Sequence, residues 1–410
     1  MVDGCSSAAG PLAHSQLWNG DVVQGGDSPE PWNLGPGYLQ QELLPVDLLR
    51  EAYWSALAEY GAAALGYGAD NGARVVRASL AARAAVDDGV PCEADQVVLT
   101  AGTTQALYLI CTALAGAGSV VLVDETSYDI GRRLFAESGL STRQVASDPA
   151  GMDPVALAAT IRAVRAEGRQ VGFVYLNPTF HNPTGVVLPG PRRRELVEVA
   201  GREGVLIVED DAYRELNLDE EKPPTSLAAL ADYQGVIRLG SFSKTLGPGL
   251  RLGWLITNAE LAERLVSRAV FASGGCLNHT TSLAVGTMLP HSYDRHLRWL
   301  RGELRRRRDA LAAVLREELP AGVGFAVPAG GFFLWLRFDS GVDDETLVSA
   351  AAQAGVRVAA GSRFGSSGPA IRLAYSFNSP AGLTEAGHRL ATAWRPLLRS
   401  NSSRNGAHPR

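Results

Sequence analysis

Short apolar runs alternate with longer amphipathic stretches along most of the chain. The runs that resemble strands buried on both faces are residues 96–100, 119–124, 172–176, 205–210, 236–241 and 251–257. Most of them are separated by ten or more residues of helical character, so the pattern predicts crossover helices around a largely parallel sheet. Only nine residues separate the last two runs. That distance is too short for a helical crossover, so it allows one antiparallel strand in the sheet.

The pattern changes near His291. A long Arg-rich helix is expected over residues 296–319, followed by strand-like segments GVGFAVP, GGFFLWLRF and AIRLAY and by helices near 343–354 and 381–397. This mixture predicts a second, smaller α+β domain. In an acidic protein the run Arg305–Arg308 is interpreted as a solvated helix face rather than a nucleic-acid patch.

The domain boundaries follow from these changes in pattern. We expect a large α/β domain over 46–290 and a small domain that combines 31–45 with 291–398. Residues 1–30 and 399–410 are small, polar and without periodicity, and they are predicted to be a mobile arm and a disordered tail.

Composition narrows the function classes. The chain has 410 residues, 46% of them hydrophobic and 20% charged, which is enough for a large core and excludes a disordered chain. A net charge of −5 argues against nucleic-acid and anionic-membrane partners. The four cysteines lie far apart and form no zinc or disulfide pattern, and neither a secretory signal nor a membrane span is evident. These features predict a cytoplasmic protein.

A lysine at the exit of a predicted buried strand is the main candidate for chemistry. Lys244 follows the run 236–241 within the segment S-F-S-K-T-L-G-P-G-L-R-L-G. Partial desolvation at such a place lowers the pKa of an amine and makes it a nucleophile for a Schiff base. Ser241 and Arg251 supply a hydroxyl and a cation suited to a phosphate. The glycines follow the lysine, so the segment does not match a Walker A loop.

This segment resembles the S-x-S-K-x-x-x-P-G-x-R-x-G signature of the class I and II aminotransferases, which are fold-type I enzymes dependent on pyridoxal 5′-phosphate (PLP). The resemblance extends from about Asn33 to Trp394, and it is most similar to the 2-aminoadipate and aromatic aminotransferase branch. It implies PLP as cofactor, bound as a Schiff base to Lys244 and contacted by Ser241 and Ser243. It also implies the fold-type I architecture, a largely parallel mixed sheet flanked by helices plus a smaller α+β domain.

Further motifs resemble parts of the cofactor site. Gly102, Thr103 and Thr104 begin a predicted helix whose N–H groups and positive end suit the cofactor phosphate, although a simple Thr-capped helix has the same pattern. Tyr128 resembles the aromatic residue that stacks on the pyridine ring, with Thr126 in place of the usual proline.

The polar contacts to the ring come from two further motifs. The segment Asn177–Gly185 matches N-P-x-x-x-N-P-T-G, which assigns Asn182 as a donor to the phenolic oxygen of the cofactor. The D-x-A-Y spacing selects Asp210 rather than Asp211 as partner of the pyridine nitrogen, and Tyr213 as a second donor to the phenolic oxygen. A carboxylate pair that binds metal is the alternative, and the lack of nearby histidine ligands argues against it.

Substrate and partner residues follow from the same resemblance. Tyr67 in Y-G-x-x-x-G corresponds to a residue that reaches the phosphate of a neighbouring subunit, which implies a homodimer with shared active sites. Arg372 in I-R-L corresponds to the arginine that binds the substrate carboxylate, with Asn182 and the backbone at Gly37 nearby. Leu39 stands where the family has proline.

The resemblance implies an enzyme of amino-acid metabolism or biosynthesis that transfers an amino group between an α-amino acid and a 2-oxo acid, with Lys244 as the proton carrier. The same cofactor chemistry also serves elimination, replacement, cyclisation and carbon–carbon bond formation in specialised metabolism, and the motifs leave these open. A transcription regulator with an aminotransferase-like domain needs a helix-turn-helix segment before it. The predicted 30-residue arm is too short for one, which favours a free enzyme.

Overall fold

The computed structural model describes residues 31–274, 278–339 and 341–402. The predicted arm over 1–30 therefore lies outside the described residues, as does most of the predicted tail. The last helix, α13 (Pro380–Ser402), continues through the first four residues of that tail.

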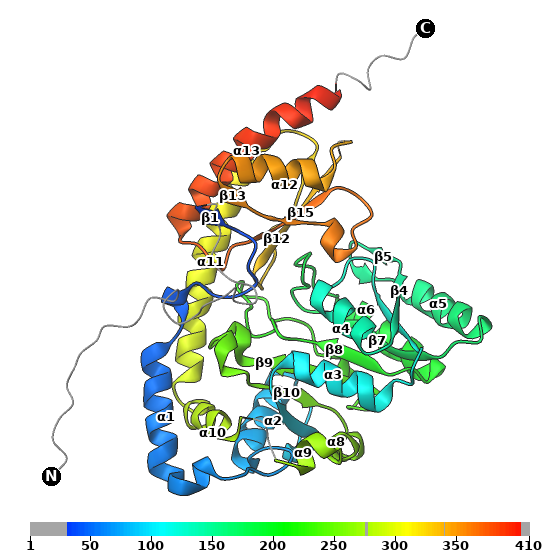
Figure 1. The fold of residues 1–410 in the computed structure, drawn as a ribbon, viewed down its shortest axis with the longest axis vertical. Helices are drawn as coiled ribbons and strands as arrows, with labels where there is room; N and C mark the ends of the chain where they lie inside the picture. Colours follow the sequence, from blue (N-terminus) through cyan, green and yellow to red (C-terminus); the bar gives the residue numbers. More distant parts are fainter. Residues whose placement is uncertain (1–30, 275–277, 340, 403–410) are drawn as a thin grey trace, which may run out of the picture.

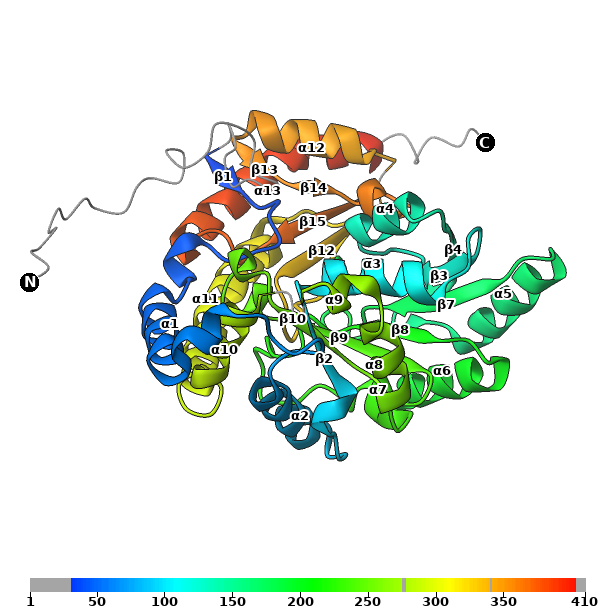
Figure 2. The same ribbon diagram turned by 60° about the horizontal axis from the view of Figure 1, so that its bottom comes forward.

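The larger part of the molecule is built on a seven-stranded sheet (Figures 1 and 2). In spatial order its strands are β2 (Val97–Thr100), β10 (Gly253–Ile256), β9 (Val236–Ser241), β8 (Ile207–Asp210), β7 (Val171–Leu176), β3 (Val120–Asp124) and β4 (Ser141–Val145). β10 is antiparallel to both of its neighbours, and the other neighbouring strands are parallel. The expected mixed, largely parallel sheet is confirmed.

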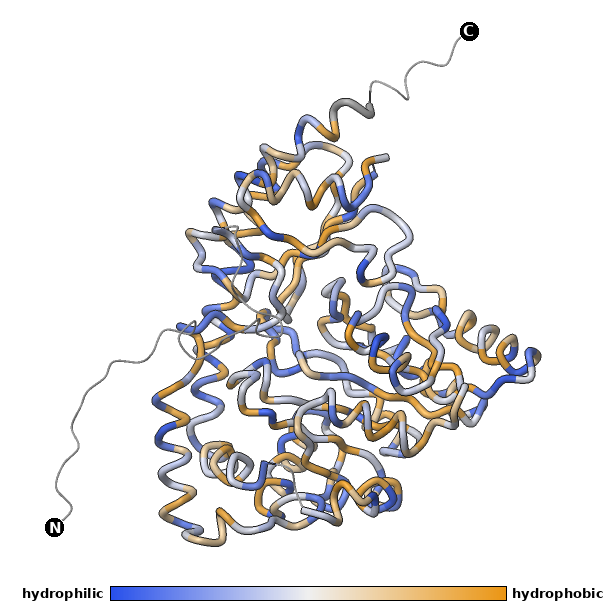
Figure 3. Tube along the Cα trace, in the orientation of Figure 1, coloured by the Kyte–Doolittle hydropathy of each residue, from blue (hydrophilic) through white to orange (hydrophobic). Residues whose placement is uncertain are grey.

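Helices cover both faces of this sheet, and they are α1 (Val46–Tyr60), α2 (Arg74–Asp88), α3 (Thr103–Leu114), α4 (Asp129–Glu137), α5 (Pro154–Ala166), α6 (Gly190–Glu203), α7 (Leu227–Leu230), α8 (Ala259–Val266), α9 (Ala269–Ala272) and α10 (His279–Met288). Alternate residues of β3 enter two separate hydrophobic clusters: Leu122 packs in one, and Val121 and Val123 pack in the other. Burial on both faces explains why these strands appear in the sequence as continuous apolar runs. Figure 3 shows the hydrophobic colour along the central strands.

The smaller part holds a four-stranded antiparallel sheet in the order β11 (Val323–Gly324), β12 (Phe333–Phe338), β15 (Ala370–Ala374) and β14 (Ala359–Ala360). It is packed against α11 (Tyr293–Glu318), α12 (Asp344–Gln353) and α13. β1 (Trp32–Asn33) pairs in parallel with β13 (Val356–Arg357), so the first described residues of the chain belong to this smaller part. We call the two parts the large and small domains, and α11 extends along both (Figure 1).

Two features differ from the sequence-based expectations. β4 was not expected, because the residues before its buried Val145 alternate between half-buried and exposed and because it pairs on one side only. The arginine run of α11 is not simply a solvated face, because Arg307 and Arg308 are buried. Arg308 donates to the Pro328 carbonyl at 2.9 Å, and Arg307 donates to the Asn378 carbonyl at 3.1 Å.

No helix in the described part of the chain combines the length and the apolar character needed to cross a bilayer.

Candidate active site

The candidate site lies at the edge where the parallel strands of the large domain end. β8 ends at Asp210, and β9 ends at Ser241, directly before the short helix η5 (Phe242–Lys244). Because β10 runs back antiparallel, the connection from 242 to 252 remains at this edge and returns Arg251 to it. The carboxyl edge of such a sheet is the usual place for a ligand.

The Lys244 amine is the centre of this site. Its Nζ donates a hydrogen bond to the Gly37 carbonyl at 2.8 Å. Burial lowers the pKa of Lys244 to about 8; the Asp210 carboxylate opposes this shift, whereas the charges of Arg372 and Arg251 reinforce it. At pH 7 about a tenth of this amine is therefore neutral and nucleophilic, far more than for an ordinary lysine amine.

The two adjacent aspartates point to opposite faces of β8. Asp210 accepts a hydrogen bond from the Tyr175 hydroxyl at 2.7 Å, and its carboxylate lies close enough to affect the pKa of the lysine amine. Asp211 instead binds Arg238 Nε at 3.0 Å on the other side of the sheet. Burial raises the pKa of Asp210, although the Tyr175 hydrogen bond opposes the rise. An ionised carboxylate at this place is therefore stabilised by a cationic partner, such as a protonated pyridine nitrogen.

Two asparagines organise the loop after β7. The backbone N–H of Asn182 donates to Asn177 Oδ1 at 2.6 Å, and the Asn177 amide donates to the Asp210 carbonyl. Asn182 Oδ1 accepts from Arg372 Nη1 at 2.8 Å. Because that oxygen is occupied, the Nδ2 group of Asn182 is the side-chain donor left for a ligand.

The guanidinium of Arg372 lies against two aromatic rings. It lies 4.1 Å from the Phe333 ring centroid and 4.6 Å from the Phe364 ring centroid. Nη2 donates to the Gly35 carbonyl at 2.7 Å, and Nε has no hydrogen-bond partner among the described residues. Burial lowers the pKa of Arg372 to about 10. A buried cation with an unsatisfied donor is a natural partner for a carboxylate.

The residues predicted to bind phosphate form a cradle at the start of α3. Gly102 caps the helix with φ of +83°, so the first N–H groups, from Thr103 and Thr104, have no carbonyl one turn before them. Arg251 Nη2 donates to the Ala101 carbonyl at 2.9 Å. A Cβ atom at residue 102 would lie 2.7 Å from that Nη2, so glycine permits the approach of the guanidinium.

The lysine segment begins close to this cradle in the sheet, because Thr100 and Ser241 pair with the same residue, Gly253. Ser241 Oγ accepts a hydrogen bond from the Ser243 N–H at 3.1 Å, which fixes the turn that leads into Lys244. Both serines are buried.

The predicted tyrosines differ in their surroundings. Tyr213 is buried, with its ring edge against Phe332 and Phe333 and its centroid 5.4 Å from the lysine amine. Tyr128 is half-buried directly before α4, and burial raises its pKa. Tyr67 is 88% exposed in the single chain, so it is not assembled with the other predicted residues.

Five groups of the site received no role from the sequence. Asn177 begins the motif of residues 177–185 and Tyr175 precedes that motif, but neither residue type reveals that both contact Asp210. The other three groups are the Gly35 carbonyl and the rings of Phe333 and Phe364, which all contact Arg372. No sequence pattern around these groups indicates the contacts, because the contacts depend on how the folded chain brings the segments together.

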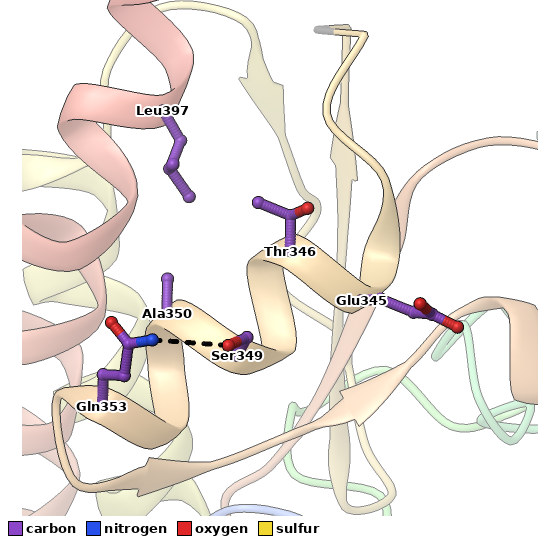
Figure 4. A pocket seen from close by; sticks show the side chains of 6 residues that line it. All are labelled: Glu345, Thr346, Ser349, Ala350, Gln353 and Leu397. Atoms are coloured by element: carbon purple, nitrogen blue, oxygen red, sulfur yellow. Dashed lines mark hydrogen bonds between the residues drawn. The ribbon is translucent and has the colours of Figure 1, made fainter.

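One cavity of the described residues lies away from this edge. A groove of about 400 Å³ runs between α12 and α13 at the far end of the small domain (Figure 4). It is lined by Glu345, Thr346, Ser349, Ala350, Gln353 and Leu397. This lining holds no amine, imidazole or thiol, so the chemistry of the protein belongs to the edge that carries Lys244.

The arrangement fits PLP. A desolvated amine suits its aldehyde, a buried carboxylate suits its protonated ring nitrogen, and the cradle before α3 suits its phosphate. The fold and these features define a PLP-dependent enzyme of fold type I. The chain belongs to the class I and II aminotransferase family, whose model matches residues 33–390. The expected family, enzyme class and cofactor are confirmed.

Known relatives agree with this assignment. The chain is 33% identical over 365 residues to the 2-aminoadipate transaminase of Thermus thermophilus, which covers 87% of this chain and 88% of that one. It is 30% identical over 333 residues to aromatic-amino-acid aminotransferase 1 of Thermococcus litoralis, with 81% and 79% covered. The solved α-aminoadipate aminotransferase LysN of Thermus thermophilus matches with a TM-score of 0.80 and 31% identity, over 90% of this chain and 93% of that one.

A similar domain occurs in another kind of protein. The chain is 30% identical over 389 residues to the uncharacterized HTH-type transcriptional regulator YisV of Bacillus subtilis, covering 93% of this chain and 78% of that protein.

Proposed function

We propose that this aminotransferase moves an amino group between an α-amino acid and a 2-oxo acid, with the cofactor attached covalently to Lys244 Nζ. The observation that carries the proposal is the position of this desolvated amine, whose pKa responds to both the Asp210 carboxylate and the Arg372 guanidinium. A nucleophile, a partner for the ring nitrogen and an anchor for a carboxylate are thus supplied at one edge of the sheet.

Bound PLP supplies the electron sink that stabilises negative charge at the substrate Cα. Asp210 holds the proton at the pyridine nitrogen, and the Tyr175 hydroxyl keeps its carboxylate in place at 2.7 Å. Asn182 Nδ2 and the Tyr213 hydroxyl donate to the phenolic oxygen. The Tyr175–Asp210 and Arg372–Asn182 hydrogen bonds support the roles of Asp210 and Asn182.

The phosphate is bound by the other side of the site. The first N–H groups of α3 and the positive end of that helix face the anion. Arg251 adds a full charge, and Ser241 and Ser243 add hydroxyl donors. Tyr128 covers the face of the ring.

Arg372 orients the substrate. Its guanidinium binds the carboxylate of the amino acid, which replaces the Gly35 carbonyl as acceptor of the Nη2 hydrogen bond. The released Lys244 amine then moves a proton between Cα and the cofactor carbon. Its lowered pKa, about 8, suits this role because the amine both accepts and returns a proton near neutral pH.

The half-reaction tests this proposal directly. Mixing the yellow holoenzyme with an accepted amino acid and no 2-oxo acid is expected to shift absorbance from ~420 nm to ~330 nm, both properties of the cofactor. We also expect the release of one equivalent of 2-oxo acid per active site, which chromatography would measure. Ammonia release with the ~420 nm band retained would instead indicate elimination and would contradict transamination.

The single chain also carries apolar surface suited to a second copy. Trp54 and Leu57 on α1 are 73% and 44% exposed, and Leu65 in the 3₁₀ helix η3 (Gly61–Leu65) is 73% exposed. Leu65 is close in sequence to the exposed Tyr67, and the helix that carries Trp54 and Leu57 directly precedes η3. Large exposed apolar side chains in one region are typical of an oligomer interface. We therefore propose a homodimer in which Tyr67 completes the phosphate site of the partner.

Hybrid dimers test the shared site. A mixture of Tyr67→Ala chains and Lys244→Ala chains, each nearly inactive alone, is expected to regain activity after refolding together, because one site per hybrid is intact. The control mixes Lys244→Ala chains with Tyr67→Ala/Lys244→Ala chains and regains nothing. A fully active monomer in analytical ultracentrifugation, or equal activity in both mixtures, is the result that refutes a shared site.

A further inference from the structure

Two segments far apart in sequence meet where the small domain lies against the large one. We call them the clasp: residues 125–129 of the large domain and residues 362–367 of the small domain. The Ser127 N–H donates to the Phe364 carbonyl at 2.9 Å, and Ser367 Oγ donates to a Glu125 carboxylate oxygen at 3.1 Å. These bonds link the domains directly.

An ion pair completes the clasp. The Arg363 guanidinium binds the Asp129 carboxylate, the first residue of α4. Gly365 has φ of +88°, and a Cβ atom there would lie 2.6 Å from Arg132 Nη1. Glycine therefore allows the small-domain segment to approach α4 closely.

Each half of the clasp carries a residue of the proposed site. Tyr128 stands between Ser127 and Asp129, so it is held by the large-domain half. Phe364, in the 3₁₀ helix η7 (Ser362–Phe364), is fully buried and lies against the Arg372 guanidinium at 4.6 Å. A movement of the clasp therefore moves the proposed ring-stacking residue relative to the proposed carboxylate anchor.

The ion pair is partly accessible to water on its Arg363 side. The Arg363 side chain is 55% exposed and that of Asp129 is 13% exposed, and a pair this accessible to water contributes little to stability. Two further cations, Arg132 and Arg372, lie near it. Arg372 repels Arg363 while it lacks an anion, and a bound carboxylate cancels that repulsion.

We infer that Arg363 and Asp129 are positioning residues, whose ion pair fixes the clasp and thereby holds Phe364 against the Arg372 guanidinium when that guanidinium binds a substrate carboxylate. This inference rests on the proposed function, because it takes an α-amino acid as the ligand of that arginine. The clasp thus fixes the plane of the guanidinium that forks onto the carboxylate.

Charge-neutral variants test the clasp. Asp129→Asn and Arg363→Gln are each expected to lower kcat/KM for an amino acid about 3- to 10-fold, mostly through KM, the effect of a partly exposed ion pair. The half-reaction of the corresponding amine, which lacks the carboxylate, stays unchanged. The charge-swapped variant Asp129→Arg/Arg363→Asp recovers most of the loss.

The matched control is Arg133→Gln, which breaks the exposed Arg133–Glu137 pair on the same helix and leaves kcat/KM unchanged. Equal loss for amino acid and amine shows a merely structural role and overturns the inference. Failure of the charge swap to recover activity overturns it as well. Failure of the proposed function is distinguishable, because the unmodified enzyme would then release no 2-oxo acid at all.

Discussion

Replacing Lys244 by alanine is expected to lower turnover by at least about 10²–10⁴-fold, the usual contribution of a positioned acid–base group. The amine is held by the Gly37 carbonyl at 2.8 Å, and an alanine leaves no side-chain base in its place. Covalent attachment of the cofactor is lost too, so the protein as purified lacks the ~420 nm band of the attached cofactor. Turnover and the absorption spectrum of the purified protein measure the two effects.

The lysine to which the cofactor is attached can be identified directly, because the chain has few lysines. Among its 410 residues only Lys222 and Lys244 are lysines, and Lys222 is exposed. After borohydride reduction, mass spectrometry should find the cofactor on the peptide that contains Lys244. Lys222→Arg is the matched control and keeps both the label and the activity. Label on Lys222, with Lys244→Ala still active, would disprove the assignment.

The pKa of Lys244 gives the pH dependence of attachment. Only the neutral amine attacks an aldehyde, and a pKa of about 8 makes that form predominant above pH 8. The rate at which cofactor-free protein takes up PLP should therefore rise with pH and reach half of its maximum near 8. An ordinary lysine amine would require a pH near its pKa of about 10.4.

Truncating Arg372 to alanine is expected to lower kcat/KM for an amino acid roughly 30- to 5,000-fold, equivalent to about 2–5 kcal/mol for a buried charged partner. The loss appears in kcat as well as in KM, because the carboxylate bond also orients the Cα–H bond. Arg372→Lys does not restore the activity, since lysine lacks the planar fork that the two phenylalanine rings hold in place.

The controls for Arg372 separate substrate from cofactor. Cofactor content should stay normal in Arg372→Ala, whereas it should fall in Arg251→Ala, whose guanidinium borders the phosphate cradle. The corresponding amine without a carboxylate should lose little activity. Equal losses for amino acid and amine would mean that Arg372 does not bind the carboxylate.

The sequence predicted those parts of the fold that depend on two-sided burial. The runs 205–210 and 236–241 correspond to β8 and β9, because strands covered on both faces must be apolar throughout. β4 lies at the edge and needs only partial burial, so Ser141–Val145 carries polar residues and shows no such run. Buried Arg307 depends on a carbonyl 71 residues away, which no local pattern records.

The candidate site also has a part that the sequence predicted and a part that it did not. Residues of short motifs, such as Lys244, Asn182 and Arg372, were named because their spacing follows the chain, and their assigned roles stay predictions. Alternation along β8 explains why Asp210 and Asp211 face opposite sides, although the sequence alone left that register open. The Arg363–Asp129 pair joins residues 234 positions apart and depends on how the domains meet.

The antiparallel strand β10 also sets an order of events during synthesis. Among the described strands β10 is the only sheet neighbour of β2, and it pairs Gly253 with Thr100, so β2 lacks this neighbour until the ribosome has passed β10. Until then the nascent polypeptide exposes β2 and one side of β9 as unpaired apolar edges, which invite aggregation. The cradle for the phosphate forms only when Arg251 arrives beside Gly102. Capture of the cofactor is therefore a late step, possible only after the chain has emerged beyond the sheet that holds it.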